Sequence, residues 1–250
     1  MISAVIITLN EERNIGRCID SLDGVVDEVI VVDSFSTDKT REMCHARGVQ
    51  FIQREWEGYS HTKNHANSLA RYDYILSIDA DEALSEVLKN SITSEKEKGL
   101  KGIYSFNRRT CYCGKWIRYC GWYPDVKTRL FPADIARWEG DYVHENLKFT
   151  GEPVSSHLVG DLLHYTYYEI DEHFERVERY SGLKAEELLA DNRKGGRLKG
   201  SVSAVSRFMT MFLFKLGFLD GLAGYNICRI SALAAFLKYR KLNEMRKEID

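Results

Sequence analysis

The sequence predicts an α/β protein with a mainly parallel, doubly wound sheet, flanking helices and a helical extension at the C-terminus. In the first half of the chain, apolar β-branched runs alternate with segments of helical periodicity, which is the pattern of βαβ units. The end of the chain changes to long apolar stretches broken by single charges. A chain of 250 residues that is 44% hydrophobic is large enough and apolar enough to bury a core.

The first two strands and their helices come directly from the apolar pattern. Residues 3–9, SAVIITL, fit a strand that is buried on both faces. Asn10 can cap the next helix, whose apolar positions are Ile15, Cys18, Ile19 and Leu22. DEVIVVD at 27–33 predicts a second buried strand, and STDKTREMCHARG at 36–48 predicts a capped helix.

Two more strands complete the predicted parallel sheet. VQFIQ at 49–53 predicts the third strand, SHTKNHANSLA at 60–70 a polar helix, and YDYILSID at 72–79 the fourth strand. Beyond them we expect shorter, mixed strands in the segments GIYSFNRRT, DVKTRLF, YVHENLKF and DLLHYTYY.

The C-terminal part predicts helices. Residues 169–191 form a charged amphipathic segment, and residues 201–241 are mostly apolar. No run of about twenty apolar residues occurs, so we expect two helices that meet near GFLDGLAG at 217–224 rather than a spanning helix. These helices can lie on a membrane, or they can pack on the sheet or on a second subunit. On a membrane, the cations expected to face the headgroups are Arg207, Lys215, Arg229, Lys238 and Arg240.

Charge and cysteine content narrow the class of protein. The net charge is −2, and without a basic arm or zinc-finger spacing nothing favours nucleic acid as a partner. The segment MISAVIITLN lacks the basic region and the length of a signal peptide, so we expect a cytoplasmic protein with reduced thiols. Cys111, Cys113 and Cys120 suggest zinc, but their spacing is not a paired CxxC and no fourth ligand is evident.

Polar residues close three of the predicted strands, and this is where open α/β sheets bind their ligands. The first strand ends in Thr8, Asn10 and Glu11, the second in Asp33, Ser34 and Ser36, and the fourth in Asp79, Asp81 and Glu82. The chain has no GxGxxG after its first strand, no GxxxxGK[ST] and no GxSxG, so dinucleotide oxidoreductases, P-loop NTPases and common hydrolases lack their main signal. A divalent cation, rather than a glycine cradle, would then neutralise a bound diphosphate.

Three carboxylates follow the fourth strand within four positions, in YILSIDADEAL. They are either a solvated acidic turn or a metal site. Asp79 and Asp81 point the same way in an extended segment, and carboxylate oxygens suit Mg²⁺ or Mn²⁺. Glu82 fits a metal less well, and it can instead open the next helix, where a carboxylate favours the helix dipole.

Four segments occur in a fixed order: AVIITLNEERNIGRCIDSL, DEVIVVDSFSTDKT, GYSHTKNHAN and YILSIDADE. Together they resemble the inverting family 2 glycosyltransferases of the GT-A fold, over residues 2–150. The later segments WYPDVKTRLF, VHENL and LLHYTYY are similar to a narrower subgroup, the lipopolysaccharide-core β-glucosyltransferases, which extend lipid-linked acceptors.

The resemblance implies a Rossmann-like sheet and a division of the chain. Residues 1–165 would be the GT-A catalytic domain, with nucleotide-sugar binding in 1–100 and the acceptor side in 101–165. Residues 166–250 would be a helical region that contacts a membrane or a second subunit.

The resemblance also implies roles for single residues. The nucleotide-sugar contacts would come from Thr8, Asn10, Glu11, Asp33, Lys63, Asn64, Asp79 and Arg129. Asp33 would accept from a uracil-like base, and Lys63 would screen the diphosphate. Where the family commonly has DDGS this chain has DSFS, which weakens a contact assigned to Ser34.

The metal site implied by the resemblance consists of Asp81, Asp79 and His164. Asp81 would bind the cation directly, and Asp79 would face the ribose or a metal-bound water. His164 can equally be a structural histidine, and Arg129 can equally form a surface ion pair. Trp116, Trp122 and Tyr123 can stack on sugar rings or pack in a core.

Inverting transfer also needs a base that takes the proton of the acceptor hydroxyl. The family usually has its base in an acidic motif after the metal site, and the local match is EGDYVHENL. We expect Glu145 to be the base, with Asp141 as the second candidate. Both carboxylates share a face in an extended segment, so the sequence leaves the choice open.

The expected function is therefore metal-dependent, inverting transfer of a hexose, glucose from a UDP-sugar, to a lipid-linked saccharide in lipopolysaccharide-core-like synthesis. The enzyme would be cytoplasmic and peripheral on the inner face of the cell membrane. One alternative is a sugar-phosphate nucleotidyltransferase, which needs a glycine-rich basic loop that TLNEERNIG does not offer. The other is a non-catalytic glycan-assembly protein, which would have a spoiled metal site, whereas DAD is intact.

Overall fold

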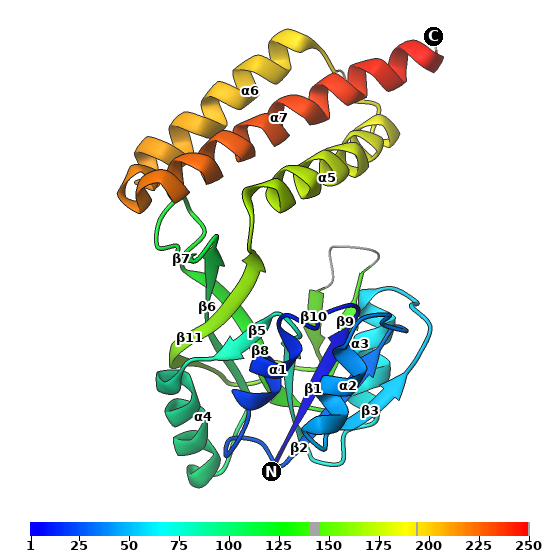
Figure 1. Ribbon diagram of the computed structural model, residues 1–250, viewed down its shortest axis with the longest axis vertical. Helices are drawn as coiled ribbons and strands as arrows, with labels where there is room; N and C mark the ends of the chain where they lie inside the picture. Colours follow the sequence, from blue (N-terminus) through cyan, green and yellow to red (C-terminus); the bar gives the residue numbers. More distant parts are fainter. Residues whose placement is uncertain (141–145, 194, 250) are drawn as a thin grey trace. The chain divides into compact units, whose positions relative to one another are not determined.

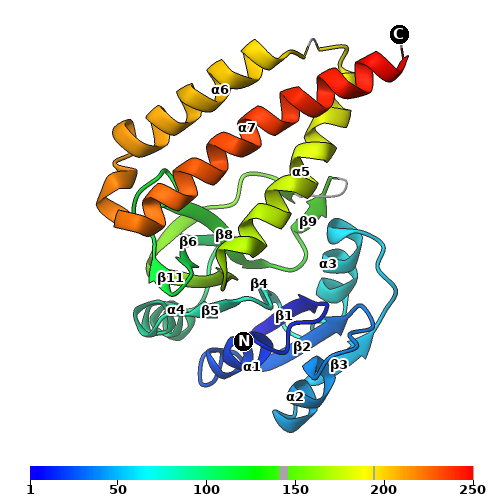
Figure 2. The same cartoon turned by 45° about the horizontal axis from the view of Figure 1, so that its top comes forward.

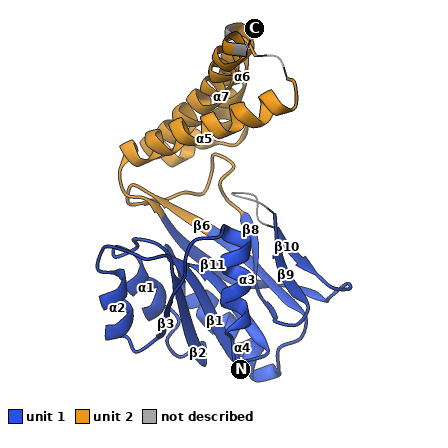
Figure 3. Ribbon diagram, turned by 90° about the vertical axis from the view of Figure 1, so that its right-hand side faces the viewer, with its two compact units in different colours: residues 1–108, 125–165 blue, residues 109–124, 166–250 orange. Residues whose placement is uncertain are grey.

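The computed structural model describes residues 1–140, 146–193 and 195–249, in two compact units (Figure 3). The first unit contains residues 1–108 and 125–165, and the second contains 109–124 and 166–250. The structure thus groups 109–124 with the C-terminal helices, whereas we had assigned this segment to the acceptor side of the catalytic domain. As functional domains, 1–165 and 166–250 stay predictions.

The parallel half of the sheet contains the four strands that the sequence predicts (Figure 1). They lie in the order β3-β2-β1-β4, with every neighbouring pair parallel. Their bounds are Ile2–Thr8 for β1, Glu28–Asp33 for β2, Gln50–Gln53 for β3 and Tyr74–Asp79 for β4. Because β2 lies on one side of β1 and β4 on the other, the strand order reverses between β1 and β4.

The sheet continues as β8-β6-β11-β5 beyond β4, and its pairings there include antiparallel ones. The bounds are Asp125–Pro132 for β8, Ile103–Tyr112 for β6, Ser155–Tyr167 for β11 and Glu82–Leu84 for β5. A separate hairpin joins β9 (Ala136–Glu139) to β10 (Asn146–Phe149). We had not predicted β5, β9 or the two-residue β7 (Lys115–Trp116), because each is too short to show a period of two.

Each face of the parallel sheet is covered, which explains why its strands are apolar throughout. Ile2, Ala4 and Ile6 of β1 share a core with α1 (Ile15–Asp20), α2 (Thr40–Ala46) and α4 (Glu86–Lys98). Val5 shares the opposite core with α3 (Tyr59–Ser68) and the β9–β10 hairpin. The α/β prediction is therefore confirmed, but the sheet is mixed. Its strands pair in parallel from β3 to β4, and antiparallel pairs occur beyond β4.

The second unit is mainly helical, and α5, α6 and α7 lie side by side (Figure 2). Their bounds are Ile170–Ala190, Arg197–Met209 and Gly221–Ile249. A π-helical turn, η1 (Thr210–Phe214), and a 3₁₀ turn, η2 (Gly217–Asp220), connect α6 to α7. The helix predicted over 169–191 corresponds to α5, which begins with a capping box between Glu169 and Glu172.

The bend between α6 and α7 falls at the predicted GFLDGLAG segment. A Cβ at Gly224 would clash with the carbonyl oxygen of Gly217, so only glycine allows this close approach of η2 to α7. Asp220 is buried there and accepts from the backbone N–H groups of Arg118 and Tyr119. Among the described helices, none could cross a membrane singly; the bent pair 198–214 and 217–248, at 73°, has the length and composition to do so.

Candidate active site

The candidate site lies where the strand order reverses, at the carboxyl ends of β1, β2 and β4. The register pairs Thr8 with Asp33 and Ile7 with Asp79, so the predicted residues of three strands lie at one edge of the sheet. In open α/β sheets this reversal point is the usual position of a ligand.

Two loops at this edge are tied together by side chains from both of them. Asn10 has a left-handed backbone, with φ of 55°, and its Oδ1 accepts from the Thr37 N–H at 2.8 Å. The Asn10 N–H in turn donates to Ser36 Oγ at 2.8 Å, and the Glu11 N–H donates to Thr40 Oγ1 at 2.8 Å. The predicted helix cap at Asn10 is wrong, because α1 begins only at Ile15 and Asn10 instead joins the two loops.

Asp33 is fully buried beneath these loops. Its Oδ2 accepts from the Ser36 N–H at 2.9 Å and from Gln53 Nε2 at 3.2 Å, and its Oδ1 accepts from Ser36 Oγ. A carboxylate has about four lone-pair sites, so Oδ1 keeps acceptor capacity for the base contact that we predicted.

Two hydroxyl groups beside Asp33 have no hydrogen-bond partner among the described residues. They are Thr8 Oγ1 and Ser34 Oγ, both buried at strand ends. Both oxygens have almost no accessible surface, so a ligand would reach them only after a local rearrangement. The contact of Thr8 with a nucleotide stays a prediction, and Ser34 stays weakly assigned.

Asp79 is held between two buried cations. Its Oδ1 lies 3.0 Å from Lys63 Nζ, and its Oδ2 lies 2.6 Å from an Arg129 nitrogen. Burial by itself would raise the pKa of Asp79, but Arg129 and Lys63 outweigh it and hold the pKa far below its usual range. Arg129 is therefore no surface residue: it is 5% exposed.

Glu82 extends this arrangement into a chain of alternating charges. Its Oε1 lies 3.1 Å from Arg129 and 3.3 Å from Arg108, and its Oε2 accepts from the Asp79 N–H at 3.0 Å. Arg108 continues to Asp125 at 2.8 Å. The expectation that Glu82 opens a helix is wrong, because Glu82 is buried in β5 and Ser85 caps α4 by accepting from the Leu88 N–H.

Asp81 faces a different partner from Asp79. The antiparallel pairing of β5 with β11 sets His164 opposite Glu82, and His164 Nε2 lies 3.1 Å from Asp81 Oδ2. The Tyr165 N–H also donates to the Asp81 carbonyl at 2.9 Å, which fixes the DAD turn against β11. The structure therefore brings Asp81 and His164 together from positions 83 residues apart.

This pair fits a cation that substrate oxygens would help to hold. An oxygen and an imidazole nitrogen are suitable donors for Mn²⁺, and Mg²⁺ is commonly bound by one or two protein groups together with phosphate oxygens and water. No set of three His, Cys, Asp or Glu side chains among the described residues could enclose a metal by itself. Asp79 is engaged by Lys63 and Arg129, so its place as a metal ligand stays a prediction.

Helix α3 is attached to the β9–β10 hairpin through the residue pair 63–64. The Asn64 side chain both accepts from the Trp138 N–H at 2.9 Å and donates to the Trp138 carbonyl at 2.8 Å. Lys63 Nζ lies 4.6 Å from the centre of the Trp138 ring. The contacts seen for Asn64 are thus structural ones, and its contact with a nucleotide stays a prediction.

The two candidate bases, Asp141 and Glu145, lie outside the described residues. Their segment joins β9 to β10, and the flanking residues Glu139 and Asn146 are paired across that hairpin. Ser60 Oγ of α3 donates to the Gly140 carbonyl at 2.7 Å, which attaches the residue before this segment to α3.

Sequence reasoning missed Glu82 as the centre of the charge chain, together with Arg108, Asp125 and Trp138. One signal was available: Arg108 and Arg129 interrupt apolar strand patterns, and a charged residue inside a buried strand needs a buried partner. The partner's identity was not available, because Glu82 lies 26 and 47 residues away.

The arrangement combines four cations with five carboxylates. Lys63, Arg129, Arg108 and Lys127 face Asp79, Glu82, Asp125, Asp81 and Asp33 at this edge, so the protein groups carry no excess of positive charge. A diphosphate bound here would therefore need a cation beside Asp81 and His164 to offset the negative charge. Asp33 can receive the uncharged part of the same ligand.

Comparisons with known proteins find relatives over nearly the whole chain. Residues 3–132 match the sequence profile of Glycosyl transferase family 2. An uncharacterized glycosyltransferase of Rickettsia prowazekii is 30% identical, over 98% of this chain and 87% of that protein. A lipopolysaccharide core biosynthesis glycosyltransferase of Rhizobium meliloti is 29% identical, over 96% of this chain and 91% of that protein.

Among solved structures, similarity extends to glucosyl-3-phosphoglycerate synthase of Mycobacterium tuberculosis. That enzyme was crystallised with Mn²⁺, uridine diphosphate and glucosyl-3-phosphoglycerate. It is 31% identical over 46% of this chain and 44% of that chain, with a TM-score of 0.36.

We predict that Asp79→Asn lowers stability at pH 7 and flattens its dependence on acid. The variant leaves Lys63 and Arg129 without their carboxylate, which should cost about 3 kcal/mol. In the native protein the folded pKa of Asp79 is depressed, so its contribution is present above the unfolded pKa, about 3.9, and is lost as the pH falls below it. Below about pH 3.5, the unfolding free energy of the variant should therefore fall by about 1.4 kcal/mol less per pH unit than that of the unsubstituted protein.

Urea unfolding at pH 7, 5, 4 and 3 measures both effects. The matched control is Asp23→Asn, an exposed carboxylate that takes no part in the charge chain. Equal acid dependence in Asp79→Asn and the unsubstituted protein would show that Asp79 is not held ionised by the two cations.

Proposed function

The chain belongs to glycosyl transferase family 2, and from that membership we propose that it transfers a hexose from a UDP-sugar to a lipid-linked saccharide, with inversion. The observation that carries the proposal is the pairing of Asp81 with His164 at the reversal of strand order, where a cation held by this pair would offset the charge of a diphosphate. The acceptor would belong to a cell-envelope glycan of the lipopolysaccharide-core kind. The lipopolysaccharide core glycosyltransferase of Rhizobium meliloti, similar over nearly its whole length, supports that choice.

Different residues of the active site would bind the nucleoside and the diphosphate of the nucleotide sugar. Asp33, Thr8 and Ser34 would receive the nucleoside at the ends of β1 and β2. Asp81 and His164 would hold Mg²⁺ or Mn²⁺, which when bound neutralises the charge of the leaving diphosphate. Lys63 and Arg129 hold Asp79 ionised and orient it toward the ribose side of the same edge.

The transfer itself needs an in-line attack and a base. The acceptor hydroxyl forms a bond to the anomeric carbon on the face opposite the diphosphate, while the bond from that carbon to the phosphate oxygen breaks. The nucleoside diphosphate leaves with the electron pair, and the hydroxyl proton passes to a carboxylate, Glu145 or else Asp141. Attack from the opposite face inverts the configuration.

Family membership decides between the enzyme alternatives. A sugar-phosphate nucleotidyltransferase would belong to another family, and the match over residues 3–132 is to glycosyl transferases. A glycosyltransferase is an enzyme, which sets aside the non-catalytic assembly protein as well.

Membrane association is the remaining part of the proposal. Exposed apolar residues recur at helical spacing along α6 and η1, in a stripe made of Leu198, Val202, Val205, Met209 and Leu213. An exposed apolar stripe of this length on an amphipathic helix fits the surface of a bilayer.

The six cysteines are free, which supports a reducing compartment, so we place the protein on the cytoplasmic face of the cell membrane.

We predict that Asp81→Asn abolishes cation-dependent transfer and leaves the fold intact. Turnover with a panel of nucleotide hexoses, with Mn²⁺ or Mg²⁺ and with or without a lipid-linked acceptor, should fall at least ~100-fold. Unfolding free energy should change by less than about 1 kcal/mol, because Asp81 contacts one described side chain, His164.

A second readout is independent of turnover. Mn²⁺ binding in the presence of UDP, followed by electron paramagnetic resonance, should weaken about tenfold or more in Asp81→Asn and stay unchanged in Asp23→Asn. Unchanged turnover of Asp81→Asn would remove the metal assignment. No turnover of the unsubstituted protein with any donor would overturn the proposed transfer.

We predict that Glu145→Gln retains donor binding and loses transfer. The amide keeps the shape of the side chain but cannot accept the proton, so kcat should fall between about 10² and 10⁴-fold while UDP-sugar affinity stays within twofold. Asp141→Asn is the matched comparison. If Asp141→Asn loses transfer and Glu145→Gln does not, the base is Asp141.

We predict that the double variant Val202→Glu, Val205→Glu weakens binding to phosphatidylcholine–phosphatidylglycerol vesicles about tenfold or more. Two charges in the stripe oppose its burial in the interface. Cosedimentation without detergent measures the bound fraction. Val87→Glu on α4 is the control, because Val87 is also exposed, at 55%, but lies in the first unit. A protein that stays wholly soluble with vesicles present would contradict the membrane proposal.

A further inference from the structure

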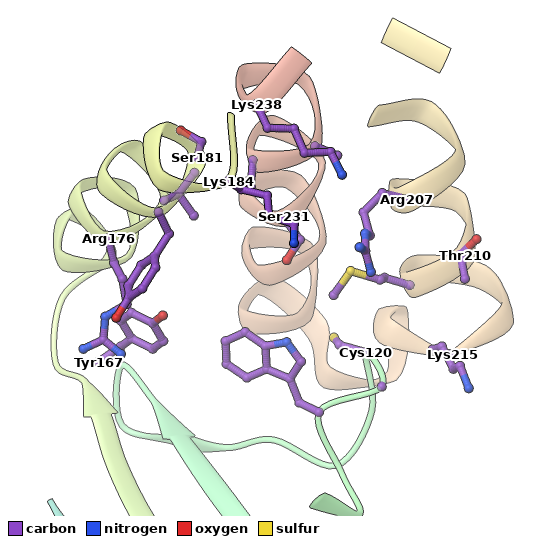
Figure 4. Close-up of a pocket in the computed structure, with 17 residues that line it drawn as sticks. Cys120, Tyr167, Arg176, Ser181, Lys184, Arg207, Thr210, Lys215, Ser231 and Lys238 are labelled. Carbon is purple, nitrogen blue, oxygen red and sulfur yellow. The ribbon is translucent and has the colours of Figure 1, made fainter. Parts of the chain in front are cut away.

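A cavity of about 510 Å³ lies within the second unit and takes no part in the candidate active site (Figure 4). Helices α5 and α7, the α6–η1 segment, the loop at 120–122 and Tyr167 supply its walls, and all of them belong to the second unit. The volume falls in the range of about 300–1,000 Å³ that small-molecule sites occupy.

Cations converge on this cavity from three helical segments. The described lining residues include no carboxylate and five cations: Arg176, Lys184, Arg207, Lys215 and Lys238. Arg207, Lys215 and Lys238 are among these lining residues (Figure 4), and their contact with membrane headgroups stays a prediction.

Most of this positive charge is not neutralised by protein groups. Lys184 pairs with Glu187 at 2.6 Å, and Arg176 donates to Thr166 Oγ1 at 2.7 Å. Arg207, Lys215 and Lys238 form no ion pair in the described part of the chain. Arg207 and Lys215 are exposed and Lys238 is half-buried, so water screens much of their mutual repulsion, and an oxyanion at the cavity is attracted by their unpaired charge.

The other walls suit a sugar ring. Trp122 stacks on Tyr167 with ring centres 6.1 Å apart and planes 29° apart, and Tyr180 lines the same cavity. Aromatic faces provide flat apolar surface for the ring of a saccharide, while the hydroxyl group of Ser231 can bond to its hydroxyls. The forked guanidinium of Arg207 is suited to a phosphate.

We propose that this cavity binds a phosphorylated saccharide, with the phosphate between Arg207 and Lys238 and the ring on the aromatic wall. The binding does not depend on the proposed transfer. If that transfer is correct, the ligand is a phosphate-bearing part of the acceptor, and this one identification rests on the proposed function.

Calorimetric titration with glucose 6-phosphate tests the proposal, with UDP and Mn²⁺ present in excess to occupy the active site. We expect saturable binding that weakens at least tenfold in the double variant Arg207→Gln, Lys238→Gln. The control Lys199→Gln, Arg240→Gln removes the same charge from the same helices at positions that do not line the cavity, and should stay within twofold. Absence of saturable binding, or equal loss in both double variants, overturns the proposal.

Two further probes separate the parts of the ligand. Tyr180→Leu should weaken glucose 6-phosphate without weakening inorganic phosphate, because only the sugar contacts the aromatic wall. If inorganic phosphate binds as tightly as glucose 6-phosphate, the cavity is an anion site and the saccharide assignment is wrong.

If the cavity variant loses binding to phosphatidylglycerol vesicles while glucose 6-phosphate does not bind, the anion is a lipid headgroup and the proposal fails. Thermal melting of each variant shows that it is folded.

Discussion

A buried chain of alternating charges is the constraint on which the first unit depends. It runs from Lys63 through Asp79, Arg129, Glu82 and Arg108, and each carboxylate touches a cation on either side. Desolvating one such charge alone would cost several kcal/mol, so each is tolerated only with its neighbours in place. These residues come from α3, β4, β8, β5 and β6, and the charge chain therefore requires that five elements reach their positions together.

The same chain of alternating charges determines which groups are available at the edge of the sheet. Asp79 is held ionised between two cations, whereas Asp81 contacts His164. The two neighbouring carboxylates of this short motif therefore have different partners. Asp81 follows the end of β4, next to the point where the strand order reverses.

The charges of the second unit are not linked into a chain of ion pairs as those of the first unit are. Its buried Asp220 is satisfied by backbone N–H groups, whereas only Lys184 of the five cations around its cavity forms an ion pair in the described part of the chain. Gly224 permits the tight bend that sets α6 beside α7, and with α5 these helices enclose the cavity. The unit thus carries both an exposed apolar stripe on α6 and η1 and a cavity with five cations in its lining.

The sequence by itself determined the local elements: the four parallel strands, the helix that Glu169 caps and the bend at GFLDGLAG. Each depends on periodicity, a cap or a glycine within a few residues, and such short-range signals can be read directly. It also placed Thr8, Asp33 and Asp79 near one another, because the ends of parallel strands meet at one edge, and the resemblance to family 2 glycosyltransferases added Lys63. Only the tertiary structure decided that Glu82 is buried, that Arg129 reaches it across 47 residues and that Arg207 faces a cavity. Those outcomes depend on which strands and helices become neighbours, and a charge acquires its partner only when strand order and helix packing are complete.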